Sequence, residues 1–147
     1  MIAITGVTGH VGGGVARRLA DLGPRLVVRD AARAPDLPGC EVREAEYADR
    51  EACRTAFAGV DTLLLVSGSE SDRRREEHRT AIAAAADAGV QHVVYTSFQG
   101  AAPDATFTLG RDHHDAESAL GDSGMATTML RNSFYLDVLP LFGAARG

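Results

Sequence analysis

Three glycines at intervals of three residues, Gly6, Gly9 and Gly12, point most clearly to chemistry in this chain. They follow a short apolar run at 2–5 and precede apolar residues that recur with the period of a helix. In such a place, glycines allow a tight turn, let backbone N–H groups approach phosphate oxygens and let the helix pack closely on the sheet. The motif predicts a site for the pyrophosphate of a dinucleotide, although the same glycines would suit a purely structural turn.

A second candidate contact, Arg29, ends the apolar run at 26–28. NAD-specific domains place a carboxylate at this point for the ribose 2′-hydroxyl, whereas a guanidinium binds the oxygens of a 2′-phosphate. Arg33 lies four residues later and adds a second contact if this segment is helical. Asp30 stands beside Arg29 and would suit NAD instead. The residues favour NADPH over NADH, and a plain surface role for Arg29 stays open.

Small polar residues end two later apolar runs, at 62–66 and 91–97. The first run is followed by Ser67, Gly68 and Ser69, and the second closes with Thr96 and Ser97. Ligands of open α/β sheets bind at the carboxyl ends of the strands, where small polar side chains suit a ribose or nicotinamide wall. A turn that merely ends the strand explains Ser69 equally well.

His113 and Glu117 lie four residues apart, on one face of an expected helix. A histidine with a carboxylate neighbour can donate a proton near neutral pH, so the pair is a candidate catalytic site. An exposed ion pair at this spacing is the alternative. His113 and His114 diverge by about 100° on a helix and cannot share one metal ion, so we expect no metal site.

Expected strands and helices alternate along the whole chain, which predicts one doubly wound α/β domain over 1–147 with a parallel sheet and three α/β/α layers. Asp49 is suited to cap one helix, and Gly89 to end another. The expected strands are 2–5, 26–29, 40–47, 62–66, 91–97 and 125–130. The expected later helices are 49–57, 72–88 and 112–120, with a short apolar tail at 135–142 that could be helical.

Composition excludes several classes of protein. The formal net charge of −5 provides no broad positive field, so nucleic-acid binding is not expected. The run of arginines at 73–75 precedes Glu76 and Glu77, and we expect it to form a solvated helix face, with His78 on the helix surface. No apolar stretch is long enough to span a membrane and no signal peptide precedes the first strand, so a cytoplasmic location without membrane contact is expected.

Five segments together carry a more specific signal than the glycines alone: residues 1–12, 28–30, 63–70, 92–97 and 122–135. In these segments the chain resembles the NmrA-like atypical short-chain dehydrogenase/reductase family, and within it the bacterial type 2 NAD(P)H:quinone oxidoreductases. The resemblance implies a Rossmann fold and hydride transfer from NADPH to a quinone or related electrophilic carbonyl. It implies cofactor contacts from the glycine loop, Arg29, the 67–69 turn and the segment from Ser133 onward: Gly6, Thr8, Gly9, His10, Val11, Gly12, Arg29, Ser67, Gly68, Ser69, Ser133, Phe134 and Tyr135.

The family lacks the Tyr-x-x-x-Lys pair of ordinary short-chain dehydrogenases, and here His113 and Glu117 occupy its place. Reduction of a quinone leaves a delocalised anion, so the missing pair does not exclude catalysis. A second hypothesis is a non-catalytic NAD(P) sensor that regulates a protein partner. A nucleotide-sugar epimerase relative is disfavoured because Tyr95 and Tyr135 each lack a lysine four residues on.

The resemblance covers only the N-terminal half of family members, whose C-terminal part builds the substrate pocket. We therefore expect the chain to lack that part and to turn over poorly. Apolar residues that the missing half would cover, namely Leu136, Val138, Leu139 and Phe142, could make the chain a homodimer.

Overall fold

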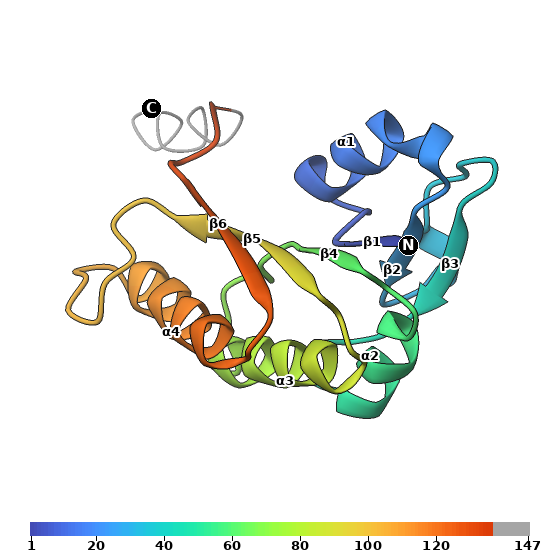
Figure 1. The fold of residues 1–147 in the computed structure, drawn as a ribbon. Helices are drawn as coiled ribbons and strands as arrows, with labels where there is room; N and C mark the ends of the chain where they lie inside the picture. Colours follow the sequence, from blue (N-terminus) through green and yellow to red (C-terminus); the bar gives the residue numbers. More distant parts are fainter. Residues whose placement is uncertain (137–147) are drawn as a thin grey trace.

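The computed structural model describes residues 1–136, which form one six-stranded parallel sheet with helices on both faces (Figure 1). The strands are β1 (Ile2–Thr5), β2 (Arg25–Val28), β3 (Glu41–Glu44), β4 (Thr62–Leu65), β5 (His92–Phe98) and β6 (Ala126–Asn132). The helices are α1 (His10–Arg18), α2 (Arg50–Phe57), α3 (Arg74–Asp87) and α4 (Thr108–Asp122). The predicted doubly wound fold is confirmed.

The strand order is β3-β2-β1-β4-β5-β6, so the chain reverses its direction of travel across the sheet between β1 and β4. Register is in phase across this centre, where Ala3 of β1 pairs with Arg25 of β2 and with Leu63 of β4. The connections that leave β1 and β4 turn to opposite sides, which opens a crevice at the carboxyl ends of these two strands. The fold thus places the glycine loop and the 67–69 turn next to each other.

Two apolar cores flank the sheet. The smaller lies under α1 and includes Ile4, Leu26 and Leu64. The larger lies between the sheet and α2, α3 and α4, and includes Phe57 and Leu120. Figure 1 shows α1 alone above the β1–β2 half and the three other helices together on the opposite face. The fully buried β1 and β4 side chains on both faces hold the ends of these strands in place under the site.

Helix ends follow the predicted caps in two places and differ in one. Asp49 caps α2 by accepting a hydrogen bond from the N–H of Ala52, and Gly89 ends α3 with a φ of +80°. Helix α4 begins at Thr108, four residues before the expected start at Asp112. The extra turn contains Gly110, where a Cβ would lie 2.8 Å from the Cβ of Ala105, so this glycine allows close packing rather than breaking the helix.

The expected solvated helix face is wrong at Arg74, and the expected surface position of His78 is wrong as well. Arg74 and His78 are buried, with 2% and 0% of their surface exposed, whereas Arg73 and Arg75 are exposed as expected. Arg74 and His78 lie on the same helix face as Ala81, Ile82 and Ala85, because residues three or four apart share a face. A charged side chain, Arg74, and a titratable one, His78, are therefore buried beside the larger apolar core.

Two other expectations concern residues that lie partly outside the described chain. The expected tail helix at 135–142 lies mostly outside it. Of the apolar residues expected at an interface, Val138, Leu139 and Phe142 also lie outside it, whereas Leu136 is described and 81% exposed. Among the helices of residues 1–136, none has the length and apolar character that a membrane crossing requires.

Candidate functional site

The glycine loop is built by close approach of backbone atoms. Gly6 has a φ of +64°, which side chains disfavour, and its carbonyl accepts a hydrogen bond from the N–H of Gly9 at 3.0 Å. At Gly12, a Cβ would lie 2.4 Å from the carbonyl oxygen of Gly6 and 2.6 Å from that of Thr5. The third glycine therefore lets α1 start directly against the end of β1.

The first turn of α1 suits an anion. The helix begins after Gly9, which has no side chain to cap it, and no acidic residue lies in this turn. The leading N–H groups of a helix have no partner within the helix, and they carry partial positive charge. The loop and helix start therefore fit a pyrophosphate, as the glycine spacing predicts.

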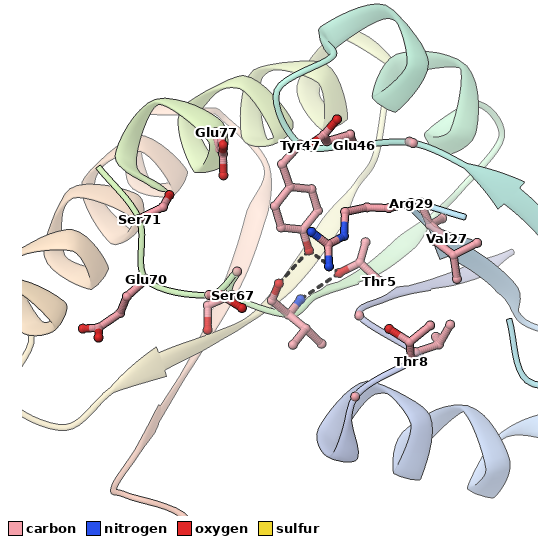
Figure 2. Close-up of a pocket in the computed structure, with 18 residues that line it drawn as sticks. Thr5, Thr8, Val27, Arg29, Glu46, Tyr47, Ser67, Glu70, Ser71 and Glu77 are labelled. Carbon is pink, nitrogen blue, oxygen red and sulfur yellow. Dashed lines mark hydrogen bonds between the residues drawn. The ribbon is translucent and has the colours of Figure 1, made fainter. Parts of the chain in front are cut away.

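A cavity of about 410 Å³ opens beside this loop, over the carboxyl ends of β1, β2 and β4. In Figure 2, Arg29 extends from the end of β2 into this cavity, with its guanidinium beside the ring of Tyr47. Arg29 is exposed, and so is Arg33, which lies in the short 3₁₀ turn Ala31–Arg33. Asp30 caps that turn by accepting a hydrogen bond from the N–H of Ala32, so its carboxylate is already engaged.

Tyr47 is a site residue that sequence reasoning missed. Its hydroxyl lies 2.6 Å from Oγ1 of Thr5 and donates to the carbonyl oxygen of Val66 at 2.6 Å (Figure 2). Thr5 in turn accepts from the N–H of Val66 at 2.9 Å. Burial raises the pKa of Tyr47, so the hydroxyl keeps its proton. This network ties the ends of β1 and β4 together on the cavity floor.

The turn after β4 forms the opposite wall of the cavity. Thr96 on β5 orders its first residue, because Oγ1 of Thr96 accepts from the N–H of Ser67 at 2.8 Å. Both backbone groups of Gly68 bind side chains of α3, the carbonyl accepting from Arg74 and the N–H donating to His78. The turn is thus fixed from beneath by buried side chains.

His113 and Glu117 share a face of α4 but do not pair with each other. Nδ1 of His113 lies 2.8 Å from the hydroxyl of Tyr95, and its Nε2 lies 3.2 Å from the guanidinium of Arg74. Because a guanidinium only donates, Nε2 is the acceptor and Nδ1 carries the hydrogen. Burial and the charge of Arg74 lower the pKa of His113 to about 4, so the ring is neutral at pH 7. Its catalytic role stays a prediction.

Glu117 belongs to a separate polar cluster. It accepts a hydrogen bond from Ser97 at 2.5 Å and two from Arg131, at 3.0 and 2.7 Å. Burial acts to raise the pKa of Glu117, but the hydrogen bonds from Arg131 and Ser97 outweigh it and the pKa is lowered. The carboxylate is therefore ionised and links α4 to the ends of β5 and β6; a catalytic role for it also stays a prediction.

The segment after β6 is described as far as residue 136. Ser133, Phe134 and Tyr135 are exposed. The ring of Phe134 packs edge-on against Phe98 of β5 at 5.2 Å between centroids, and the hydroxyl of Tyr135 accepts from Asn132. The segment thus starts beside the end of β5, and its expected cofactor contacts stay predictions.

The cavity brings seven of the predicted site residues together: Gly6, Thr8, Gly9, Arg29, Ser67, Gly68 and Ser69. Glu46, Tyr47 and Glu77 line it as well and were not predicted. His10, Val11 and Gly12 lie in α1, directly after the lining glycines, while Arg33, Thr96, Ser97, His113 and Glu117 lie behind or beside the walls. Groups of three or more metal-ligating side chains are absent from residues 1–136.

Comparison with known proteins gives a consistent result. A family model described as NAD(P)H-binding matches residues 6–138. Quinone oxidoreductase 2 of Escherichia coli (strain K12) is 41% identical over 141 residues, covering 92% of this chain and 49% of the relative. A (4-alkanoyl-5-oxo-2,5-dihydrofuran-3-yl)methyl phosphate reductase of Streptomyces griseus subsp. griseus is 42% identical over 142 residues, covering 92% and 48%.

A solved structure agrees in fold. An NADPH-dependent quinone oxidoreductase from Escherichia coli, complexed with NADPH, superposes with a TM-score of 0.86 at 39% identity and covers 96% of this chain and 53% of its own. The resemblance read from the sequence is confirmed. The chain spans about half the length of the curated relatives it matches.

Proposed function

Since the chain belongs to the NAD(P)H-binding family, we propose that it binds NADPH in the cavity between the glycine loop and the 67–69 turn. We further propose that the protein is an oxidoreductase that reduces a quinone or a related electrophilic carbonyl. The observation that carries the proposal is the cavity itself, which joins an uncapped helix start to an arginine at the end of β2. A dinucleotide with a 2′-phosphate has an anionic group for each of them: the pyrophosphate for the helix start and the 2′-phosphate for the arginine.

Each end of the site has a distinct task in this proposal. The N–H groups at the start of α1 bind the pyrophosphate, and Arg29 binds the 2′-phosphate of the adenosine ribose. The Ser67–Ser69 turn lies against the nicotinamide ribose. Ser133, Phe134 and Tyr135 close the site beyond β5. Neutral His113 and ionised Glu117 do not line the cavity; they orient Tyr95 and Ser97 of β5.

The names of two relatives support this choice of acceptor, since one is a quinone oxidoreductase and the other a reductase of an unsaturated furanone phosphate. Bound NADPH supplies a hydride, that is, two electrons and one proton. The quinone then needs one further proton from water to become the hydroquinone. The anion left by hydride transfer is delocalised and stable, so it does not need a proton donor positioned by the protein. The residues here therefore need only hold two rings in reactive contact.

We expect Arg29→Ala to weaken NADPH binding roughly 10- to 100-fold and to leave NADH binding nearly unchanged. The reason is that charge-assisted hydrogen bonds to a phosphate contribute about 1.5–3 kcal/mol. Calorimetric titration of the purified chain with each nucleotide measures both constants. Arg18→Ala is the matched control, because Arg18 carries the same charge at the far end of α1.

Equal loss of affinity for NADPH and NADH in Arg29→Ala would contradict the assigned 2′-phosphate contact. Wild-type protein that binds neither nucleotide would overturn the whole proposal. Consumption of NADPH with benzoquinone, menadione or an azo dye would contradict the sensor hypothesis, because a sensor binds the cofactor without turnover.

A further inference from the structure

We propose that Arg74 and His78 are positioning residues that hold the peptide of Gly68 in the conformation that receives NADPH. The inference rests on the proposed function and assigns to it two buried side chains of α3 that the cofactor itself does not touch. Gly68 lies in the cavity wall, and side chains of α3 bind both its N–H and its carbonyl group.

The contacts fix the direction of one peptide group on each side of Gly68. The N–H of Gly68 donates to Nε2 of His78 at 2.9 Å, and the carbonyl of Gly68 accepts from Nε of Arg74 at 2.9 Å. Glycine permits backbone conformations that other residues disfavour, so without these bonds the turn has several states open to it. Ser67 and Ser69 on either side line the cavity, and their positions depend on which state is taken.

His78 is suited to accept and unsuited to change its charge. With Nε2 accepting from Gly68, its Nδ1 must carry the hydrogen, and this Nδ1 has no hydrogen-bond partner among residues 1–136. A buried donor without a partner destabilises the folded protein, and an apolar side chain at this position would avoid that cost. Burial and the charge of Arg74 lower the pKa of His78 to about 3, so the acceptor is present at every physiological pH.

Arg74 joins the turn to α4. Beyond Gly68, its guanidinium reaches Nε2 of His113 at 3.2 Å and Oδ2 of Asp112 at 3.6 Å. Its Nη1 has no hydrogen-bond partner in the described chain. A buried arginine loses more free energy by desolvation than an apolar residue would, so packing alone does not account for it. Among the partners of Arg74 named here, Gly68 lines the cavity and Asp112 and His113 do not, so the bond to the carbonyl of Gly68 is the one that connects Arg74 to the site.

The position of the turn gives this arrangement a role in binding. The 67–69 turn faces the glycine loop across the cavity, and the glycine loop is held by its own backbone bonds (Figure 2). A wall that is already in the bound conformation avoids the loss of conformational entropy on binding. We therefore expect the two α3 side chains to act on the affinity for NADPH through Gly68.

Two substitutions at His78 separate positioning from packing. His78→Gln keeps an acceptor oxygen near the place of Nε2, and His78→Leu fills a similar volume with no acceptor. Loss of the bond is expected to raise the Kd for NADPH about 10-fold or more in His78→Leu, while His78→Gln stays within about 3-fold of the wild type. Fluorescence titration with NADPH measures the Kd.

An independent readout needs no cofactor. Hydrogen exchange of the Gly68 amide, followed by NMR in ¹⁵N-labelled protein, is expected to be slow in the wild type and in His78→Gln and faster in His78→Leu. Amides of β1 and β4 serve as internal references for global stability, and circular dichroism confirms that each variant is folded.

Arg74→Met tests the other side of the peptide, with Arg79→Met as the matched control. Arg79 lies on the same helix and pairs with Asp115 of α4, but its side chain is 63% exposed and does not contact the turn. We expect Arg74→Met to raise the Kd for NADPH about 10-fold and Arg79→Met to leave it unchanged.

The outcomes are distinct. If wild-type protein binds NADPH and His78→Leu binds it equally well, the positioning role is wrong while the proposed function stands. Equal losses in His78→Gln and His78→Leu would also overturn it, since packing would then explain both. If wild-type protein does not bind NADPH, the proposed function itself fails, and the positioning role fails with it.

Discussion

Gly12→Ala is expected to lower the free energy of unfolding by roughly 3 kcal/mol, the upper end of the usual cost of overpacking. An alanine Cβ would lie 2.4 Å from the carbonyl oxygen of Gly6 and 2.6 Å from that of Thr5. Both are backbone atoms at the end of β1, and they cannot move aside as a flexible side chain would. Relief of the contact requires α1 to shift away from the sheet.

Gly14→Ala is the matched control on the same helix. The nearest atom to a Cβ at Gly14 is the end of the Arg18 side chain, at 3.6 Å. Alanine in a helix interior is more stable than glycine by about 0.5–1 kcal/mol, so this variant is expected to be more stable than the wild type. Urea unfolding followed by circular dichroism measures both changes. A Gly12→Ala protein as stable as Gly14→Ala would show that the close approach is not needed.

A second large effect is expected from acid. The pKa values of His78 and His113 are lowered to about 3 and about 4, in both cases first by burial and then by the charge of Arg74. Below the ordinary histidine pKa of about 6.5, these two side chains bind a proton in the unfolded chain but not in the folded protein, so stability falls as the pH falls. Each ring then removes up to about 1.4 kcal/mol of stability for every unit of pH. The loss continues to about pH 4 for His113 and about pH 3 for His78.

Urea unfolding at several values between pH 5 and 8 tests this effect, because most carboxylates in the unfolded chain are still ionised there. Above pH 7, the free energy of unfolding of His78→Gln is expected to differ from that of the wild type by a constant amount. Between pH 6.5 and 5, it is expected to fall less than that of the wild type. His113→Gln is expected to behave in the same way. Parallel curves for wild type and both variants would show that the folded protein accepts the protons after all.

The glycine loop, the alternation of strands and helices and the cap at Asp49 could be predicted because each depends on local chemistry. Glycine spacing between a strand and a helix fixes a backbone geometry, and alternating strands and helices permit few topologies. The burial of Arg74 and His78 could not be predicted from residue type, since arginine is seldom buried. Only their spacing from Ala81, Ile82 and Ala85 carried a signal, which a polar residue in an apolar stripe obscures.

The pair at His113 and Glu117 shows a related limit. The sequence correctly predicts a shared helix face, because the spacing of four residues determines it. It does not show which elements face that helix. Arg74 arrives from α3 and Arg131 from β6. Each places a positive charge beside its partner, which keeps His113 neutral and Glu117 ionised. Tyr47 was missed for a similar reason, because its hydroxyl bonds to strands that precede and follow it by many residues.

The central place of β1 in the sheet has a consequence for the order in which the protein can assemble during translation. β1 is made first, but one of its two neighbours, β4, does not begin until Thr62, after β2 has ended at Val28. At about 5–20 residues per second, the ribosome needs roughly 2–7 s to make the intervening stretch. For that interval one edge of β1 has no partner, and the crevice that receives the cofactor has only one of its two walls.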